Sequence, residues 1–205
     1  MSVIAEQIAG FKTSALLEFS DRPPWELTGE AIGIVERLLS RLEQNYTVRD
    51  NVAVHRTSIV ESGVIIKGPA IVGPGCYIAA TAYLRGGCWL EANCILGPGA
   101  ELKSSFVFRG SKLAHFNFVG DSVLGSGVNL EAGSIIANYR NERASPAISF
   151  FHGGKRLDTG VDKFGALVGD QTRIGANAVI APGAILAPAT IVKRLSLIDQ
   201  AIAET

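Results

Sequence analysis

The polar side chains best suited to chemistry in this chain gather between residues 102 and 140. In chain order they are Lys103, His115, Asn129, Asn138 and Tyr139. A neutral imidazole can take up a proton near pH 7. A lysine ammonium is a compact positive charge that suits a bound anion. These residue types permit proton transfer next to an anionic ligand. The alternative is structural: a corner histidine bonded to the backbone, a stacked corner asparagine and solvated lysines.

A repeat of six residues sets the elements that must hold these side chains. A large apolar residue recurs at every sixth position from Val54 to Phe108. The column resumes at Phe118, Leu124, Leu130 and Ile136, and returns at Val168, Ile174, Ile180, Leu186 and Val192. Mostly small residues stand four positions after the large ones, and they include Cys76, Cys88 and Cys94. Because buried cysteine behaves as a small hydrophobic residue, we expect these thiols to be structural.

The period of six predicts an all-β solenoid, a parallel β-helix built from hexapeptide repeats. Neither the helical period of 3.6 residues nor the simple alternation of a strand produces it. Each hexad forms one short strand and one corner, and about three hexads make one triangular coil. Glycine–proline pairs at residues 73–75 and 97–99 suit the corners. We expect a left-handed helix, because hexapeptide proteins of this class wind that way, with about six coils.

The segment before the repeat is expected to be helical. Residues 24–44 place apolar side chains on one face at helical spacing, directly after a pair of prolines. An open end of a solenoid needs a cap. We therefore expect residues 1–50 to form an N-terminal helical cap across that end.

The remaining chain divides into the β-helix and a short tail. We expect the β-helix over residues 51–193, interrupted by an extruded loop at 138–166. That loop contains an apolar strand, a Gly-Gly turn and a basic return, which predicts a hairpin. Insertions of this kind map to one face, so we expect the loop to reach a neighbouring subunit. Residues 194–205 are expected to form a C-terminal helix.

Composition excludes several classes of protein. Hydrophobic residues make up 47% of the chain and charged residues 19%, as in a globular protein. Lys+Arg and Asp+Glu both number 19, so the formal net charge gives no general attraction to nucleic acid or anionic lipid. Glu6, Gln7 and Lys12 interrupt the apolar residues of the N-terminal segment, which therefore suits neither a signal peptide nor a membrane span. We expect a cytoplasmic protein.

Several motifs resemble one family of sugar-phosphate enzymes. They are KSS at 103–105, KxxH ending in His115, GDS at 120–122, VNLEAGSIIANYR at 128–140, and Lys163-Phe164 further on. Over about residues 65–185 the chain is similar to the acetyltransferase domain of the bifunctional sugar-1-phosphate uridyltransferase/glucosamine-1-phosphate acetyltransferases. It resembles the archaeal sugar-1-phosphate nucleotidylyltransferase/acetyltransferases even more. The resemblance implies a homotrimer with sites between subunits.

The resemblance also implies roles for individual residues. His115 stands where the family has its general base, and Tyr139 where a main-chain N–H lines the reacting centre. Asn129 and Asn138 match positions that hydrogen-bond the sugar and its amide. The positions that grip the sugar phosphate are matched by Arg85, Lys103 and Lys163. Those that line the acetyl-coenzyme A site are matched by Ala132 and Ala176. The implied reaction is acetyl transfer to the amine of an amino-sugar 1-phosphate.

Some departures from the family pattern favour a second hypothesis. The family has a tyrosine three residues after the base, where this chain has Phe118. Archaeal relatives carry lysines beyond the NxR motif, where this chain has Ala144 and Ala147. No glycine-rich nucleotide loop opens the chain, so we expect no nucleotidyl transfer. The alternative to an enzyme is a non-catalytic sugar-phosphate or nucleotide-sugar binding trimer, or a scaffold subunit.

A metal enzyme on the same fold is disfavoured. The zinc-dependent γ-type carbonic anhydrases need three histidines, two of them in an HxxxxH spacing. This chain has only His55, His115 and His152, without such a pair. Its three cysteines form no CxxC motif. We expect acetyl-coenzyme A as the co-substrate and no metal.

Overall fold

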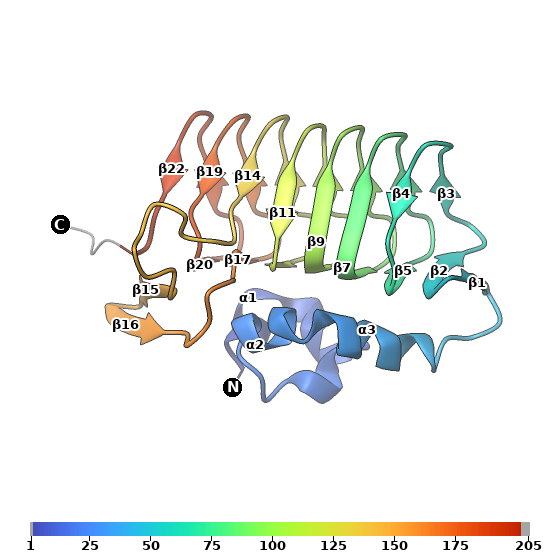
Figure 1. The fold of residues 1–205 in the computed structure, drawn as a ribbon, viewed down its shortest axis with the longest axis horizontal. Coiled ribbons are helices and arrows are strands. Elements are labelled where there is room, and N and C mark those ends of the chain that lie inside the picture. The colour runs from blue at the N-terminus through green and yellow to red at the C-terminus, as the bar shows by residue number, and fades with distance from the viewer. Residues whose placement is uncertain (1, 202–205) are drawn as a thin grey trace.

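The computed structural model describes residues 2–201 and has the form of a parallel β-solenoid with a layer of helices along one side (Figure 1). Each coil is roughly triangular and contributes one strand to each of three walls. Within a wall, the strands of successive coils pair in parallel. Wall 1 contains β2 (Val52–His55), β5 (Ala70–Val72), β12 (Val123–Leu124), β17 (Ala166–Val168) and β20 (Ala184–Leu186). The long strands β7 (Tyr83–Leu90) and β9 (Glu101–Val107) begin in wall 3 and end in wall 1.

The other two walls consist of very short strands. Wall 2 is a seven-stranded sheet. Its members are β3 (Ile59–Val60), β6 (Tyr77–Ile78), β8 (Ile95–Leu96), β10 (Lys112–Leu113), β13 (Asn129–Leu130), β18 (Arg173–Ile174) and β21 (Ile191–Val192). Wall 3 contains β4 (Ile65–Ile66), β11 (Phe118–Gly120), β14 (Ile135–Ile136), β19 (Val179–Ile180) and β22 (Leu197–Ile198). The β-solenoid is thus confirmed, with seven strands stacked on wall 2 where about six coils were expected; its left-handed winding stays a prediction.

The interior follows the predicted apolar column, with two shifts in register. Leu84, Leu102 and Val119 stack on one wall, and Leu90, Val107 and Leu124 on the next. Val107 follows Leu102 by five residues, because β9 turns the corner without a break, and Leu124 likewise follows Val119 by five. The prediction of Phe108 and Phe118 as interior residues is therefore wrong. Phe108 packs outside wall 1 and Phe118 lies on the outer face of wall 3.

The N-terminal helices lie along wall 1 and do not cap the end of the solenoid, as Figure 1 shows. They are α1 (Val3–Gln7), α2 (Pro24–Gly29) and α3 (Ala31–Leu39), with the short 3-10 turns η1 (Ala9–Thr13) and η2 (Leu17–Phe19). The physical reason is the outer face of wall 1, which presents an apolar side chain on successive coils. These residues are Ala53, Ile71, Trp89, Phe106, Val123, Leu167 and Ile185, and all are buried under this layer and the insertion. The expected single helix over 24–44 is broken at Glu30.

One glycine permits the close approach of α3 to the solenoid. Gly87 has a φ of 87°, and a Cβ built on it would lie 2.5 Å from the carbonyl carbon of Ala31. Any larger residue would push the helix away and would also be strained in the left-handed region. Gly87 therefore fixes the start of α3 beside the corner between walls 3 and 1.

The insertion is a hairpin, as predicted, but it packs on its own chain. Strands β15 (Ser149–His152) and β16 (Lys155–Asp158) pair in antiparallel register. The ring of Phe150 packs against Trp25, and the N–H of Phe151 donates to the carbonyl of Gln200. A contact between the hairpin and a neighbouring subunit stays a prediction.

The two ends of the repeat also differ from expectation. Strand β1 (Tyr46–Arg49) forms an antiparallel hairpin with β2. At the other end, β22 pairs with β19, so the helix predicted for 194–205 is wrong over residues 194–201. The interior spacing of six continues from Val192 to Ile198, and this keeps the segment in the solenoid. Residues 202–205 lie outside the described part. Among the described residues, no helix is long and apolar enough to cross a membrane.

Candidate functional site

The predicted site residues occupy two different corners of the solenoid and one wall. His115, Ala132 and Ala176 lie at the corner between walls 2 and 3. The N–H of Gly133 donates to the carbonyl of His115 over 2.9 Å, and that of Asn177 donates to the carbonyl of Ala132 over 3.1 Å. His115, Ala132 and Ala176 therefore stack on successive coils, and we call them the corner row.

The His115 side chain is exposed at one end of the corner row. In the described part of the chain, no side chain hydrogen-bonds its imidazole ring. Phe116 follows in the left-handed region and is also exposed, and Asn117 turns inward. The ring is thus open to a ligand or to a second chain.

A cluster of charged and polar groups occupies the corner between walls 3 and 1. The ammonium of Lys103 lies 2.6 and 2.9 Å from the two carboxylate oxygens of Asp121. The amide nitrogen of Asn138 donates to the same carboxylate. Asp121 is only 4% exposed, so its charge is held by these two partners. Sequence analysis did not single out Asp121, although it is the central residue of the GDS motif.

A hollow of about 390 Å³ opens beside this cluster. Lys103 and Asp121 line it from the solenoid, Lys163 lines it from the insertion, and Gly29 and Ile32 line it from the helices. Thr28, Gly86, Ser104, Val161 and Asp162 complete the lining. The structure thus brings Lys103 and Lys163 together around Asp121, which also binds Asn138. The hollow is lined in addition by helical residues that the sequence motifs did not indicate. No short motif marks them, because only the docking of the helices brings them there.

Arg85 is the neighbour of Lys103 in the ladder but is engaged elsewhere. Its guanidinium forms an ion pair with Glu101 at 2.7 Å and lies over the ring of Tyr83. Arg85 therefore does not line the hollow, although it borders the same corner.

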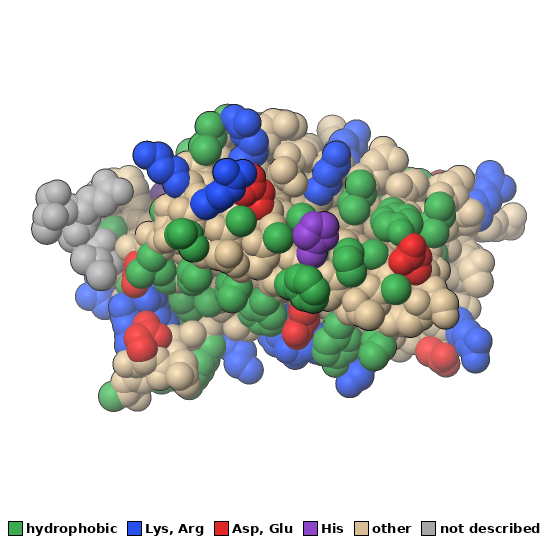
Figure 2. Space-filling model, turned by 90° about the horizontal axis from the view of Figure 1, so that it is seen from above, with side chains coloured by type: hydrophobic (Ala, Val, Ile, Leu, Met, Phe, Trp, Pro, Cys, Tyr) green, Lys and Arg blue, Asp and Glu red, His purple; other side chains and the backbone are tan. Residues whose placement is uncertain are grey.

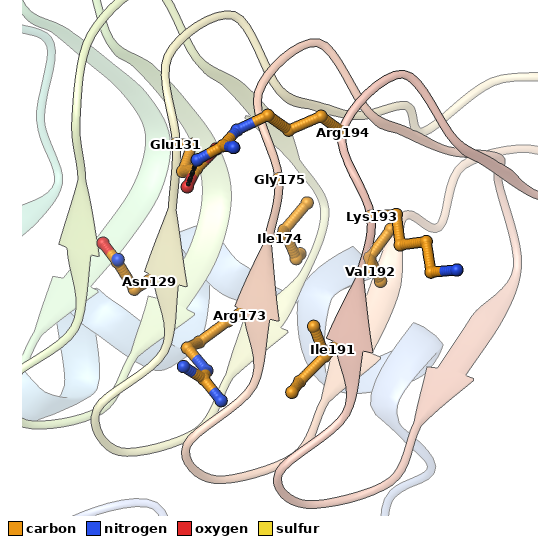
Figure 3. A pocket seen from close by; sticks show the side chains of 9 residues that line it. All are labelled: Asn129, Glu131, Arg173, Ile174, Gly175, Ile191, Val192, Lys193 and Arg194. Atoms are coloured by element: carbon orange, nitrogen blue, oxygen red, sulfur yellow. Dashed lines mark hydrogen bonds and ion pairs between the residues drawn. The ribbon is translucent and has the colours of Figure 1, made fainter.

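Asn129 lies in a second, more basic hollow of about 500 Å³ on the outer face of wall 2 (Figure 3). Arg173 and Lys193 extend from neighbouring strands, and Arg194 reaches back to Glu131. Two hydrogen bonds of 2.7 Å from Arg194, together with the N–H of Ala176, hold the pKa of the Glu131 carboxyl below its usual range. Sequence analysis did not predict these three basic residues.

The three residues of the motif at 138–140 have different surroundings. Asn138 joins the Asp121 cluster, and Tyr139 is exposed. Arg140 is fully buried, where its guanidinium bonds the carboxylate of Asp199 at 2.7 Å and the carbonyl of Pro182 at 2.7 Å. These bonds to Arg140 hold the pKa of Asp199 below its usual range. Arg140 therefore ties the root of the insertion to the last described coil.

The two corners do not converge within one chain. Gly120 is the ladder neighbour of Lys103, and it follows His115 by five residues. The three residues of β11 lie between His115 and Asp121 and cover about 10 Å of strand. The imidazole and the Asp121 cluster thus stand at opposite ends of β11. Among the described residues, no three His, Cys, Asp or Glu side chains are grouped to hold a metal ion.

Figure 2 shows the face of the molecule opposite the helices. Hydrophobic side chains form patches along this face, and Lys and Arg side chains gather toward the end where the C-terminus lies. The exposed apolar residues of walls 2 and 3 are Ile59, Ile65, Ile135, Ile191 and Leu197. Unlike wall 1, these two walls carry uncovered apolar side chains.

Comparison with known proteins relates the chain to hexapeptide acetyltransferases. Residues 69–104 match the bacterial transferase hexapeptide family model (six repeats). The bifunctional protein GlmU of Methanococcus maripaludis is 38% identical over 185 residues, which cover 87% of this chain and 44% of that protein. The bifunctional sugar-1-phosphate nucleotidylyltransferase/acetyltransferase of Sulfurisphaera tokodaii is 34% identical over 145 residues, covering 71% of this chain and 36% of that protein.

A solved structure is more distantly similar. The acetyltransferase domain of PglB from Neisseria gonorrhoeae, in complex with acetyl coenzyme A, has 11% sequence identity and a TM-score of 0.37. The match covers 86% of this chain and 69% of that one, and a TM-score this low supports no inference about the site. The chain spans less than half the length of the two curated relatives named above. On the sequence matches, it belongs to the hexapeptide-repeat acetyltransferases, and its β-helix is homologous to the acetyltransferase region of GlmU and of the archaeal bifunctional enzymes.

Proposed function

We propose that this protein transfers an acetyl group from acetyl-coenzyme A to the amine of an amino-sugar 1-phosphate. Glucosamine 1-phosphate and galactosamine 1-phosphate are the acceptors to test first. The amine nitrogen attacks the thioester carbonyl, the carbon–sulfur bond breaks and an amide forms. His115 takes the proton from the amine, and the departing coenzyme A thiolate recovers it.

The observation that carries this proposal is the corner row with His115 at one end and a basic hollow at the other. Neighbouring coils are about 4.8 Å apart, so the row covers about 10 Å from His115 to Ala176. Ala132 and Ala176 leave room along the corner for a narrow chain. Gly175, next to Ala176, lines the hollow that contains Arg173 and Lys193. A pantetheine arm along the row would set the thioester at His115 and the coenzyme A phosphates at those cations.

The acceptor phosphate is assigned to the cluster around Lys103. Lys103 and Lys163 provide two positive charges at the hollow, and Asp121 holds Lys103 in place. Asp121 and Asp162 offset those charges, so the hollow suits a singly esterified phosphate better than a longer polyphosphate. Asn138, held by the same carboxylate, supplies hydrogen bonds to the sugar.

Two chains are needed to complete this site. The amine and the phosphate of the acceptor are on adjacent carbon atoms, whereas His115 and the Lys103 cluster stand at opposite ends of β11. A neighbouring subunit that places its own corner row against this cluster would bring them together. The exposed apolar residues of walls 2 and 3 suit such a contact. We therefore propose a homotrimer with three sites between subunits.

The second candidate is a trimer that binds a sugar phosphate or nucleotide sugar without catalysis. It is favoured by Phe118, whose ring replaces the family tyrosine on the outer face of wall 3 and offers no hydroxyl to a phosphate. It requires the Lys103 cluster and does not require His115.

A thiol-release assay tests the proposal directly. Purified protein is supplied with acetyl-coenzyme A and each acceptor, with His115→Ala as the test variant and His152→Ala as a matched histidine control. The three cysteines are buried, and burial raises the pKa of Cys88 to about 12, so the folded chain should add little thiol signal. We expect turnover that falls at least about 100-fold in His115→Ala and is unchanged in His152→Ala. Turnover retained in His115→Ala would remove the imidazole from the mechanism, and binding of the acceptor without turnover would favour the second candidate.

A further inference from the structure

Phe116, the residue after His115, combines the left-handed conformation of its corner with a bulky aromatic ring that is exposed. Its φ is 51°, in the left-handed region, and the residue is 73% exposed. The equivalent corner residues on the other coils also have positive φ. They are Gly63, Thr81, Gly99, Gly133, Asn177 and Leu195. Most are types that tolerate this conformation, whereas a bulky side chain there is strained.

The surroundings of Phe116 hold this strained geometry in place. Its N–H donates to the carbonyl of Pro98 over 3.0 Å. Asn117 is 2% exposed, and its amide donates to the carbonyl of Glu131 over 2.8 Å and to the hydroxyl of Ser134 over 3.0 Å. Backbone strain persists only where the surroundings over-determine it, and such sites cluster at ligand-binding positions.

The ring of Phe116 has a defined direction. A Cβ built on Gly99, one coil toward the N-terminus, would lie 2.5 Å from Cδ1 of the Phe116 ring. The absence of a side chain at Gly99 therefore makes room for the ring. Ala132, the next member of the corner row, lies one coil away on the opposite side of His115. The ring thus leans away from the path assigned to coenzyme A.

We infer that Phe116 is a stacking platform for the sugar ring of the acceptor and so helps to select a pyranose as the substrate class. This inference rests on the proposed function. One face of a pyranose carries C–H groups that pack on an aromatic ring and release water from both surfaces. The adjacent imidazole of His115 then meets the amine on the same sugar. Phe116 therefore contributes to acceptor affinity and not to the binding of acetyl-coenzyme A.

Because the backbone of Phe116 is left-handed, loss of the ring should affect stability and acceptor affinity in opposite ways. Removal of the ring in Phe116→Gly relieves the strain, so the thermal midpoint should stay equal to or above that of wild type. The same change should raise the KM for the acceptor about ten-fold, the size of one aromatic contact, and leave the KM for acetyl-coenzyme A unchanged. A merely structural aromatic residue would show the reverse pattern, with lower stability and unchanged affinity.

The test compares three variants of the full chain. Phe116→Trp keeps an aromatic face and should restore the acceptor KM to within about two-fold of wild type. Leu195→Gly is the matched control, because Leu195 is an exposed apolar residue in the same left-handed corner position. It should leave the acceptor KM unchanged. Steady-state kinetics, thermal unfolding, sedimentation velocity and calorimetric binding of glucosamine 1-phosphate supply the readouts.

The outcomes separate this inference from the proposed function. An active wild type whose acceptor KM is unaffected by Phe116→Gly would overturn the platform and leave the enzyme. A change of oligomeric state in Phe116→Gly would also overturn it, because the ring would then be a subunit contact. If wild type binds the sugar phosphate without turnover, only the proposed function fails, and weaker binding by Phe116→Gly supports the platform. Equal binding by both proteins, or no binding to wild type, would overturn it.

Discussion

Asp121 is the residue on which the acceptor cluster depends. Its carboxylate is buried and receives the ammonium of Lys103 and the amide of Asn138 at the same time. Without a partner, the Lys103 side chain would sample many rotamers. The ion pair with Asp121 fixes one position for its ammonium. In the proposed site, Asp121 is thus a positioning residue for Lys103.

Asp121→Asn keeps the size of the side chain and removes its charge. We expect the KM for the acceptor to rise several-fold, with kcat less affected, because Lys103 and Asn138 lose their common partner. The unpaired ammonium of Lys103 should also lower the free energy of unfolding by about 1–3 kcal/mol. Kinetics and thermal unfolding would measure both effects.

Asp162→Asn is the matched control, since Asp162 lines the same hollow but is exposed. It should leave stability unchanged. A drop in stability of Asp121→Asn with no change in the acceptor KM would mean that the ion pair only supports the fold.

The helices α2 and α3 line the hollow of the proposed acceptor site as well as covering the solenoid. They bury the apolar outer face of wall 1 and place Thr28, Gly29 and Ile32 at the rim of the Lys103 hollow. Gly87 permits this close approach. The helices therefore limit the space of the hollow on one side.

Gly29→Leu tests the helices as a wall of the hollow. A Cβ at Gly29 would meet no atom within 4 Å, and its φ is not in the left-handed region, so the substitution should not lower the thermal midpoint. The added side chain would occupy space at the rim of the hollow. We expect a rise in the acceptor KM of about ten-fold, measured by steady-state kinetics.

Gly33→Leu provides the comparison for Gly29→Leu. Gly33 is also an exposed glycine with open space around its Cβ, but it does not line the hollow. The acceptor KM of Gly33→Leu should match that of the wild type. Equal KM values for the two variants would show that the acceptor does not enter this hollow.

At the scale of the whole molecule, the proposed site requires more than one chain. Wall 1 is covered by the helices, whereas walls 2 and 3 expose apolar residues. Because His115 and the Lys103 cluster lie at opposite ends of β11, each proposed site takes its base from one subunit and its phosphate-binding lysine from another. A subunit contact that covers exposed residues such as Ile135 would then also complete the site.

Subunit complementation follows from this arrangement. His115→Ala and Lys103→Ala, each inactive alone, should regain activity when they are co-expressed with different tags and purified as mixed oligomers. In a doubly tagged trimer, about one site in three should combine an intact His115 with an intact Lys103. Activity assays on the doubly tagged species, with sedimentation velocity for the trimer, would measure this. A monomer, or a trimer without recovered activity, would contradict a site shared between subunits.

The repeat of six, taken from the sequence alone, determined the solenoid, the buried cysteines and the hairpin between the strands that end at Ile136 and begin at Ala166. An inward-facing position is a local property, because each hexad must bury its large residue against the hexads before and after it. For the same reason, Ile198 continues the column and residues 194–201 do not form the expected helix. The roles of His115, Lys103 and the other site residues came from the family resemblance, and they remain predictions.

Only the tertiary structure decided which corner each polar residue occupies and what covers each wall. Two five-residue steps, from Leu102 to Val107 and from Val119 to Leu124, each shift the interior positions by one residue, so the column count wrongly placed Phe108 and Phe118 inside. The pairing of Lys103 with Asp121 joins residues one coil apart, and the contact of α3 with Gly87 joins still more distant segments. Such contacts depend on how coils stack and how helices dock. The hydrophobic pattern along one strand does not contain that information. It shows which side chains face inward, but not which residues pack against the outward side chains.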